Sequence, residues 1–257
     1  MEKIKITFLG TGTSQGVPVI GCDCSVCSSS DSRDNRLRSS ILIQTKGQTI
    51  CIDTGPDFRQ QMLNANVMSL DAVVYTHEHK DHTAGMDDVR SFNFKQKKPM
   101  DLYVNTNVEA SLKKEFSYAF KENPYPGVPR LELHQIHNSP FTVHGVEFNP
   151  IQLMHYKLPV FGYRIGDFAY CTDVNYIAPK EKEKLKNLDV LILTALRKEK
   201  HISHYCLEEA LELIKELNPK RAFLTHISHY MGLHEDVSKE LPNNVFLAFD
   251  GLTIETY

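Results

Sequence analysis

Short apolar runs separated by polar turns dominate the beginning of the chain. Residues 4–10, 40–45 and 49–55 are rich in β-branched and aromatic residues, as strands are, and the pattern over 57–67 favours a helix. The nearly continuous apolar run 70–77 is typical of a strand buried on both faces. The sequence therefore predicts a β-rich unit that continues into alternating strands and helices.

The rest of the chain repeats this order. Its predicted elements are a strand at 101–105, a helix at 107–120, strands at 131–136, 141–153, 161–167, 168–173 and 188–196, a helix at 206–219 and a final strand at 221–227. Such a repeat predicts two sheet-and-helix halves packed sheet against sheet. Because no Gly/Ser-rich linker interrupts the chain, we expect one domain over 1–257, of the α/β (α+β) class.

The overall composition is that of a globular protein, with 41% hydrophobic and 24% charged residues. A net charge of -3 argues against binding of long nucleic acid through many phosphate contacts and favours a small substrate. The beginning of the chain is too polar for a signal peptide, and no run reaches the length of a membrane span. We therefore expect a cytoplasmic protein without a membrane partner.

Four potential metal ligands follow the apolar run 70–77 within six residues: His77, His79, Asp81 and His82. Imidazole and carboxylate groups suit zinc, manganese or iron, and a loop that leaves a strand can turn alternate side chains toward two ions. A solvated polar loop is the alternative explanation, and the density of ligands argues against it.

Three more ligand-type residues, His155, Asp173 and His226, are each the first polar residue after an apolar or aromatic run. A single residue of this kind is more often a cap or turn residue. Together with the four above they supply seven nitrogen or oxygen groups, enough for two metals that share a bridging carboxylate. Two metals about 3.5–4 Å apart can activate a water and clamp both oxygens of a phosphoryl displacement.

Three of the six cysteines lie in the stretch GCDCSVC, as Cys22, Cys24 and Cys27. Disulfides are rare in the cytoplasm, so metal binding or redox chemistry is expected there. The redox alternative is weaker because no strand-then-helix context surrounds the C-x-x-C pair. Ordinary strand or helix positions are expected for Cys51, Cys171 and Cys206.

The H-x-H-x-D-H motif and the downstream His, Asp and His resemble the metallo-β-lactamase superfamily of dinuclear hydrolases over essentially the whole chain. The resemblance implies a four-layer αββα sandwich with two catalytic divalent metals, zinc or manganese. It implies that His77, His79 and His155 hold one metal, that Asp81, His82 and His226 hold the other, that Asp173 bridges them, and that Asp53 supports the metal loop. An aspartate at 173, where zinc β-lactamases have cysteine, favours the phosphodiesterase and nuclease side of the superfamily.

The N-terminal pattern FLGTGTSQGVPVIGCDCSVC, followed by RLRSS, is similar to a narrower family. This is the phosphoribosyl 1,2-cyclic phosphate phosphodiesterase family of the carbon–phosphorus lyase pathway. The resemblance implies a structural zinc held by Cys22, Cys24, Cys27 and His229, and it implies a homodimer. A closed Cys₃His set is the chemistry of a structural zinc site.

His204, in the stretch KHISHYCLEEAL, resembles the general acid of the superfamily's phosphodiesterases and tRNA 3′-processing nucleases. Its imidazole suits proton transfer near neutral pH, although a helix cap is the alternative role and the expected one for His201. Surface or packing roles are expected for His134, His137, His144 and His234. Arg36 or Arg38 is a candidate contact for a substrate phosphate, although arginines in an exposed loop are more often only solvated. The basic run 94–99 is expected in a loop.

The main expectation is an enzyme that hydrolyses a small phosphodiester, such as a cyclic sugar phosphate, by attack of a metal-bridged hydroxide. Asp81 and His204 are the expected catalytic residues. The alternatives are a tRNA-processing nuclease, a thioesterase or lactonase, and a non-hydrolytic relative that serves quinone-cofactor biosynthesis. The complete ligand set argues against the last of these. Neither the natural substrate nor the catalytic metal follows from the motifs.

Overall fold

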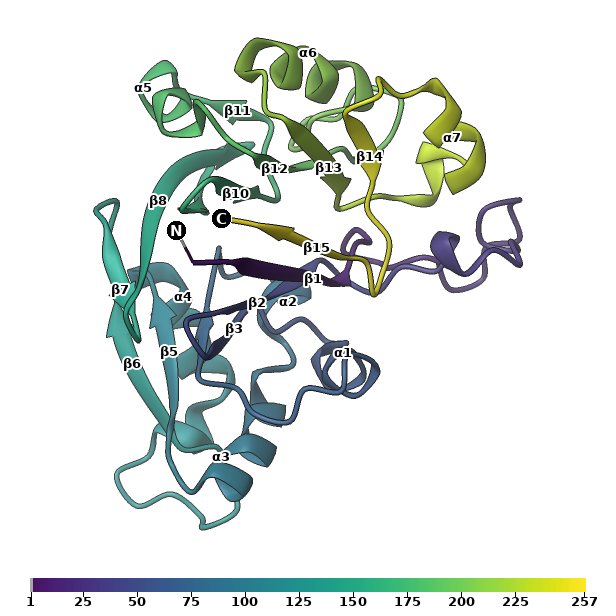
Figure 1. Ribbon diagram of the computed structural model, residues 1–257. Coiled ribbons are helices and arrows are strands. Elements are labelled where there is room, and N and C mark those ends of the chain that lie inside the picture. Colours follow the sequence, from purple (N-terminus) through teal and green to yellow (C-terminus); the bar gives the residue numbers. More distant parts are fainter. Residues whose placement is uncertain (1) are drawn as a thin grey trace.

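The computed structural model describes residues 2–257, and their strands form two sheets (Figure 1). The first sheet has the order β15-β1-β2-β3-β4-β5-β6, and the second has the order β11-β8-β9-β10-β12-β13-β14, with β7 paired to β8. The strands of the first sheet are β1 (Ile4–Gly10), β2 (Ser40–Thr45), β3 (Gln48–Ile52), β4 (Ala72–Val74), β5 (Met100–Val104), β6 (Leu131–Gln135) and β15 (Thr253–Thr256). The strands of the second sheet are β7 (Phe141–Val143), β8 (Val146–His155), β9 (Leu158–Ile165), β10 (Phe168–Cys171), β11 (Tyr176–Ile177), β12 (Val190–Thr194), β13 (Arg221–Thr225) and β14 (Val245–Leu247).

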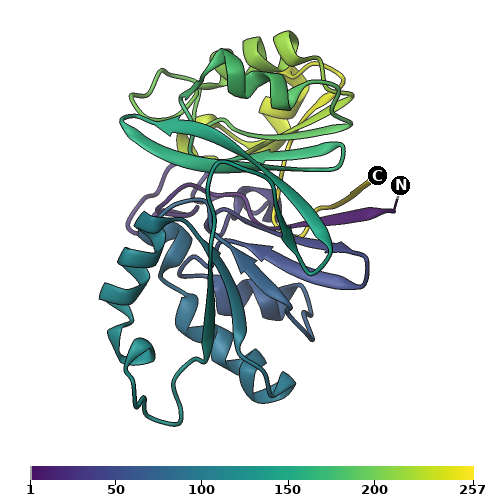
Figure 2. The same cartoon turned by 90° about the vertical axis from the view of Figure 1, so that its left-hand side faces the viewer.

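Helices cover the outer faces of both sheets, which makes four layers (Figure 2). The α-helices are α1 (Phe58–Asn64), α2 (Lys80–Thr83), α3 (Arg90–Gln96), α4 (Thr106–Glu115), α5 (Pro179–Lys182), α6 (Leu207–Leu217) and α7 (His234–Glu240). The 3₁₀ turns are η1 (Ser32–Asp34), η2 (Met86–Val89), η3 (Ser117–Phe120), η4 (Glu183–Leu185) and η5 (His229–Met231). The αββα sandwich expected from the sequence is therefore confirmed.

The two sheets pack face to face, so their central strands are buried on both sides. In β12, Val190 and Ile192 face the other sheet, whereas Leu191 and Leu193 face the helices. This double burial explains why the sequence shows a continuous apolar run there instead of an alternating one. Within the first sheet, the last strand β15 pairs antiparallel with the first strand β1 and forms the edge of that sheet.

Some sequence predictions were wrong in detail. The strand over 221–227 is not the last, because β14 and β15 follow it. Both are short, and β15 alternates polar and apolar residues as an edge strand does, so neither gives a strong apolar run. The expected loop at 94–99 begins inside α3, and the helix expected over 57–67 is confined to Phe58–Asn64. Among residues 2–257, no helix is both long and apolar enough to cross a bilayer.

Tight backbone packing fixes the segment that carries the metal-ligand motif. The Thr54 N–H donates to the carbonyl of His82, and the Gly85 N–H donates back to the carbonyl of Thr54, at 2.8 and 2.9 Å. A Cβ atom on Gly85 would lie 2.1 Å from the carbonyl oxygen of Gly55, and one on Gly55 would lie 2.2 Å from that of Asp81. Only glycines allow this close approach.

We therefore expect Gly85→Ala to displace the motif segment. The variant should lose about 1–3 kcal/mol of folding stability, or roughly 2–10 °C in melting temperature, and it should bind metal more weakly. Gly127→Ala is the matched control, because its Cβ meets only the ring of Tyr125, which is 79% exposed and free to move. Thermal unfolding and metal titration of both variants test this, and equal melting temperatures would contradict it.

Candidate metal centre

The candidate ligands lie where strands end, at the edge between the two sheets. Parallel strands β3, β4, β10 and β13 end just before Asp53, His77, Asp173 and His226 respectively, and His155 is the last residue of β8. Carboxyl ends of parallel strands are the usual place for ligand sites in α/β folds. Three of these residues, Asp53, Asp173 and His226, have φ angles of 66°, 51° and 57°. This conformation is rare for residues other than glycine, and it clusters at functional sites.

The structure brings the seven residues together in two groups. One group is His77, His79 and His155, and the other is Asp81, His82, Asp173 and His226, with the ligand atoms of each group within 4.8 Å of one another. Asp173 joins the groups: its Oδ2 lies 3.8 Å from Nε2 of His77, and its Oδ1 lies 3.3 Å from Nε2 of His82. One oxygen thus faces each group, as a bridging carboxylate requires.

These residues fit divalent metal ions. The Nε2 atoms of His77, His82 and His226 are buried and have no hydrogen-bond partner among the described residues. Buried polar atoms without partners are costly, and metal coordination satisfies them. The carboxylates of Asp53, Asp81 and Asp173 are buried or nearly so, and within the described chain their ion-pair partners are all histidines. Buried anions without Lys or Arg partners call for cations.

The electrostatics of the site favour positive charge. Burial opposes protonation of His82, but the carboxylates of Asp173, Asp81 and Asp53 raise its pKa well above the usual value. Burial likewise opposes ionisation of Asp173, yet His226 and His82 hold its pKa well below the usual range. The carboxylates that attract a proton to His82 would also attract a metal ion, because both carry positive charge. At His77 and His155 burial instead lowers the pKa, which favours the neutral imidazole that binds metal.

Asp53 orients His82 without joining either ligand group. Its Oδ2 accepts from Nδ1 of His82 at 2.7 Å, and the backbone N–H and hydroxyl of Thr76 donate to its two oxygens at 2.8 Å. Because Nδ1 of His82 bonds to Asp53, Nε2 is the nitrogen that faces the site and is available to a metal ion. The Nδ1 of His155 is similarly held by the Ser203 carbonyl at 2.8 Å.

Sequence reasoning missed the threonines of the site. A threonine precedes each of His77, Asp173 and His226. The hydroxyl of Thr172 donates to Oδ1 of Asp173 at 2.7 Å, and that of Thr76 lies 2.9 Å from Nδ1 of His77. A threonine directly before a candidate ligand was therefore the signal in the sequence for hydroxyl groups that hold His77 and Asp173 in place.

His204 lies against both ligand groups. Its ring is 4.6 Å from that of His155 and 4.7 Å from that of His226, centre to centre. One of its nitrogens lies within 4.8 Å of ligand atoms of His155 and Asp173, and its buried Nδ1 lacks a hydrogen-bond partner among the described residues. His201 lies further out, 5.4 Å from His204.

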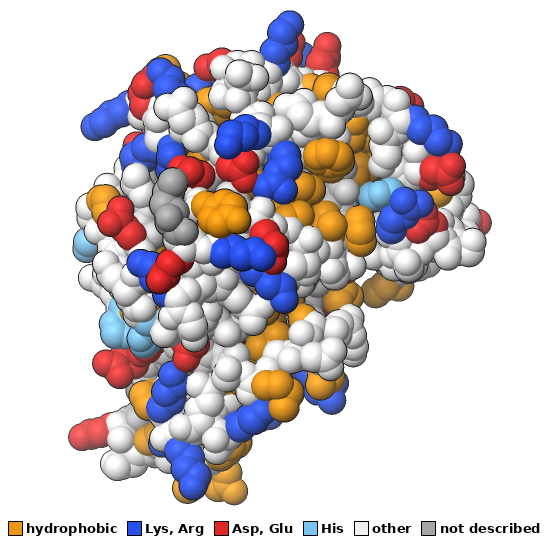
Figure 3. Space-filling model, in the orientation of Figure 1, with side chains coloured by type: hydrophobic (Ala, Val, Ile, Leu, Met, Phe, Trp, Pro, Cys, Tyr) orange, Lys and Arg blue, Asp and Glu red, His pale blue; other side chains and the backbone are white. Residues whose placement is uncertain are grey.

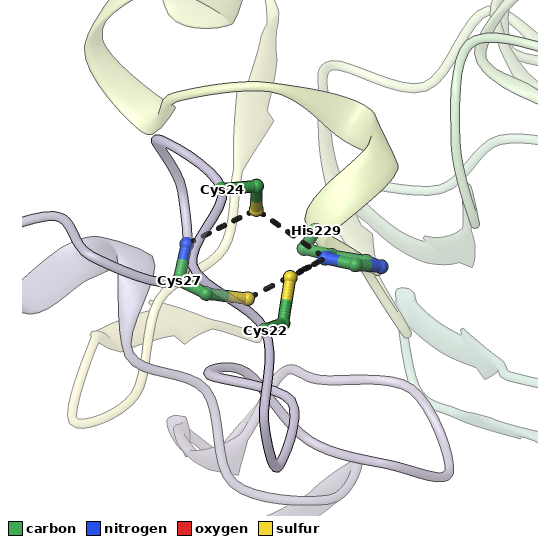
Figure 4. Close-up of side chains that lie close together, drawn as sticks. All are labelled: Cys22, Cys24, Cys27 and His229. Carbon is green, nitrogen blue, oxygen red and sulfur yellow. Dashed lines mark hydrogen bonds between the residues drawn. The ribbon is translucent and has the colours of Figure 1, made fainter.

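The cysteine cluster forms a third, separate group of potential metal ligands (Figure 4). The sulfurs of Cys22, Cys24 and Cys27 lie 3.3, 3.4 and 3.4 Å from Nδ1 of His229. Tetrahedral zinc with one nitrogen and three sulfur ligands has N···S separations of about 3.5 Å, so the group fits a structural zinc ion. The backbone N–H of Cys27 lowers the pKa of the Cys24 thiol to about 6, which favours the thiolate that zinc binds.

The two arginines considered as phosphate contacts have structural roles. Arg36 is 4% exposed, and its guanidinium bonds to the Thr11 hydroxyl, the Ala248 carbonyl and Nδ1 of His234. Arg36 is therefore neither a free phosphate contact nor a solvated loop residue, because its donors point into the protein. Arg38 is paired with Asp57. Of the remaining histidines, His134 and His144 both contact Asp101 near the surface.

Two stacked sheets with two metal-ligand groups at their edge define a class of metal-dependent hydrolases. Residues 48–227 match the family model described as "Beta-lactamase superfamily domain". The chain therefore belongs to the beta-lactamase superfamily, as the resemblance implied.

Within this superfamily the chain is similar to a protein described as a new diphosphatase from the PhnP family. The two are 41% identical, with a TM-score of 0.94 over 100% of this chain and 98% of that chain. An octanoyltransferase of Porphyromonas gingivalis is 41% identical over 252 residues, which are 97% of this chain but 51% of that protein. The chain thus spans about half the length of that relative. The fold is also similar to that of Zn²⁺-bound PqqB from Methylobacterium extorquens, with a TM-score of 0.79 over 97% of this chain and 99% of that chain. The two sequences are 21% identical, so this similarity shows the shared fold alone.

Replacing Cys24 with serine should remove one zinc per chain and lower the melting temperature, because a hydroxyl is a poor substitute for a thiolate ligand. Activity should change only as a consequence of lower stability, since the cysteines do not contact the candidate ligands of the other two groups. The control is Cys206→Ser, which lies outside all the ligand groups. Metal analysis and thermal unfolding test the prediction, and a Cys24→Ser variant with full zinc content and unchanged stability contradicts it.

Proposed function

We propose that this superfamily hydrolase cleaves a P–O bond in a small phosphodiester, using two divalent metals at the candidate ligand groups. The observation that carries the proposal is the placement of Asp173, with one carboxylate oxygen toward each group. When bound, the two metals supply an activated water and neutralise charge on the phosphoryl group. Zinc and manganese both suit this ligand set, and zinc suits the cysteine cluster.

The protein's own residues would position these components and move the proton. Asp53 holds His82 with Nε2 toward the site, and Asp173 spaces the two groups. The oxygen of a water would add to phosphorus while that water gives up a proton to the surrounding solvent, and the bond from phosphorus to the leaving oxygen would break as a protonated His204 donates its proton to that oxygen. Burial and the neighbouring His226 lower the pKa of His204 to about 3. A phosphodiester anion beside the imidazole would raise that pKa, because an opposite charge favours the protonated form.

One observation favours attack at phosphorus over attack at a carbonyl carbon: a relative that is covered over 98% of its own length is described as a diphosphatase. Diphosphates and phosphodiesters present the same reacting centre, a phosphorus with a leaving oxygen. We therefore keep a small diphosphate as the second candidate substrate.

A nuclease acting on long RNA is a weaker candidate. The net charge is -3, and on the face shown in Figure 3 basic and acidic side chains are interspersed instead of forming one positive area. Long nucleic acids are held mainly by clustered Lys and Arg contacts to phosphates. The relative described as an octanoyltransferase makes an acyl thioester worth testing, although this chain corresponds to about half of that protein.

Hydrolysis assays on metal-loaded protein test the proposal. The panel is 5-phosphoribosyl 1,2-cyclic phosphate, bis(p-nitrophenyl) phosphate, a dinucleoside diphosphate, a precursor tRNA, an octanoyl thioester and a lactone. Turnover of either phosphodiester supports the proposal, and turnover of the diphosphate alone supports the second candidate. Activity confined to the thioester or the lactone contradicts both.

The acid role of His204 predicts a dependence on the leaving group. Without its proton donor, His204→Ala should lose about 10²–10⁴-fold in rate on 5-phosphoribosyl 1,2-cyclic phosphate, whose alkoxide is a poor leaving group. On bis(p-nitrophenyl) phosphate, whose phenolate leaves without protonation, the loss should be at least tenfold smaller. The neighbouring His201→Ala is the control for local disturbance. Equal losses on both substrates would show that His204 is not the acid.

A further inference from the structure

A cavity of about 250 Å³ lies beside the candidate metal centre, in the edge between the two sheets. Its walls come from three segments: the residues that follow β5 (105–107), those that follow β6 (136–138), and the strand pair β8–β9 through Gln152 and residues 159–161. Nothing in the proposed chemistry uses these residues. The cavity therefore needs an explanation of its own.

The cavity lies next to the metal-ligand residues along the same sheet edge. Strands β4, β5 and β6 are parallel neighbours, so the residues that follow β5 and β6 lie at the same edge as His77, which follows β4. Neighbouring strands are about 4.8 Å apart, so the cavity begins within one or two strand spacings of His77. From the other sheet, the Phe161 N–H donates to the carbonyl of Thr76 at 3.1 Å, and Gln152 lies on β8, the strand that ends at His155.

The walls combine apolar side chains with groups that form hydrogen bonds. No Lys, Arg, Asp or Glu lines the cavity in the described part of the chain; its polar lining is the hydroxyl of Thr106, the imidazole of His137 and the carboxamides of Asn105, Asn107, Asn138 and Gln152. Carboxamides both donate and accept hydrogen bonds. The side-chain oxygen of Asn105 caps α4, and Asn138 bonds to Glu181 and Lys184, so these two amides are already engaged. Asn107, which is exposed in the first turn of α4, has no side-chain hydrogen bond among the described residues.

A phosphate group suits this cavity less well than a neutral group, because no lysine or arginine lines it in the described chain. A flat, neutral ring that both donates and accepts hydrogen bonds does suit it, with Phe161 and its apolar neighbours against the ring and the carboxamides at its edge. The volume of the cavity, about 250 Å³, is just below the range of sites that bind drug-sized ligands. A cavity of this size fits a single ring system such as a nucleobase.

We propose that this cavity binds the nucleobase of a nucleoside-containing phosphodiester or diphosphate while the scissile phosphate lies at the metal centre. The inference rests on the proposed function and deepens it, since it names the class of substrate. Asn107 is then a specificity-determining residue: it contacts the non-reacting part of the substrate and takes no part in bond cleavage.

Two diesters with the same leaving group test this inference. They are thymidine 5′-(p-nitrophenyl phosphate), which carries a nucleobase, and methyl p-nitrophenyl phosphate, which does not. The measured quantity is the ratio of kcat/KM for the thymidine diester to kcat/KM for the methyl diester, with fully metal-loaded protein. Wild type should favour the thymidine diester, mainly through a lower KM.

Asn107→Trp should fill the cavity and lower this ratio by at least tenfold. Asn107→Ala removes one hydrogen-bonding group and should lower it about two- to tenfold. Lys114→Trp is the matched control, because it places the same ring at an exposed position of the same helix, outside the cavity. Metal content and thermal unfolding of each variant show whether it is folded.

The outcomes separate the two proposals. A ratio that falls in both Asn107 variants but not in Lys114→Trp supports the inference. Turnover of both diesters with a ratio that neither Asn107 variant changes contradicts the inference and leaves the proposed function standing. If the wild-type protein turns over neither diester, the proposed function is contradicted, and so is this inference, which rests on it.

Discussion

The enclosure of three carboxylates that have no lysine or arginine partner is the constraint on which this structure depends. In the described chain the ion-pair partners of Asp53, Asp81 and Asp173 are all histidines. Buried charge that is only partly paired is destabilising. Cations bound at this edge would relieve that cost, so metal affinity and folding stability are expected to be coupled there.

The sandwich meets this constraint through its strand ends. Parallel strands from both sheets end at one edge, and left-handed turns at Asp53, Asp173 and His226 set the direction of the chain there. The backbone contacts between residues 53–55 and 81–85 hold the H-x-H-x-D-H segment in place. Because these contacts are between backbone atoms, the geometry of the ligand segment is set before any metal binds.

The sequence allowed the four layers and the clustering of the seven candidate ligands to be predicted, because both leave local signals. Buried strands appear as continuous apolar runs, and polar residues directly after such runs mark strand ends, as at His77 and Asp173. What could not be predicted depends on contacts distant in sequence. The arginine at 36 resembles a solvated loop residue, and only the packing of Thr11, His234 and Ala248 around it shows that it is structural.

The N-terminal loop shows the same dependence on distant contacts and connects the two kinds of candidate site. Two hydrogen bonds hold this loop in addition to the cysteine cluster with His229. The His234 N–H donates to the carboxylate of Asp34, and the Leu37 N–H donates to the carboxylate of Asp250. All three contacts come from the last thirty residues of the chain. Since His229 lies three residues beyond His226, the segment that supplies a ligand to the metal centre also anchors the loop. Any effect of the cysteine cluster on the candidate metal centre is therefore expected to pass through the stability of residues 226–229, and not through a share in the chemistry.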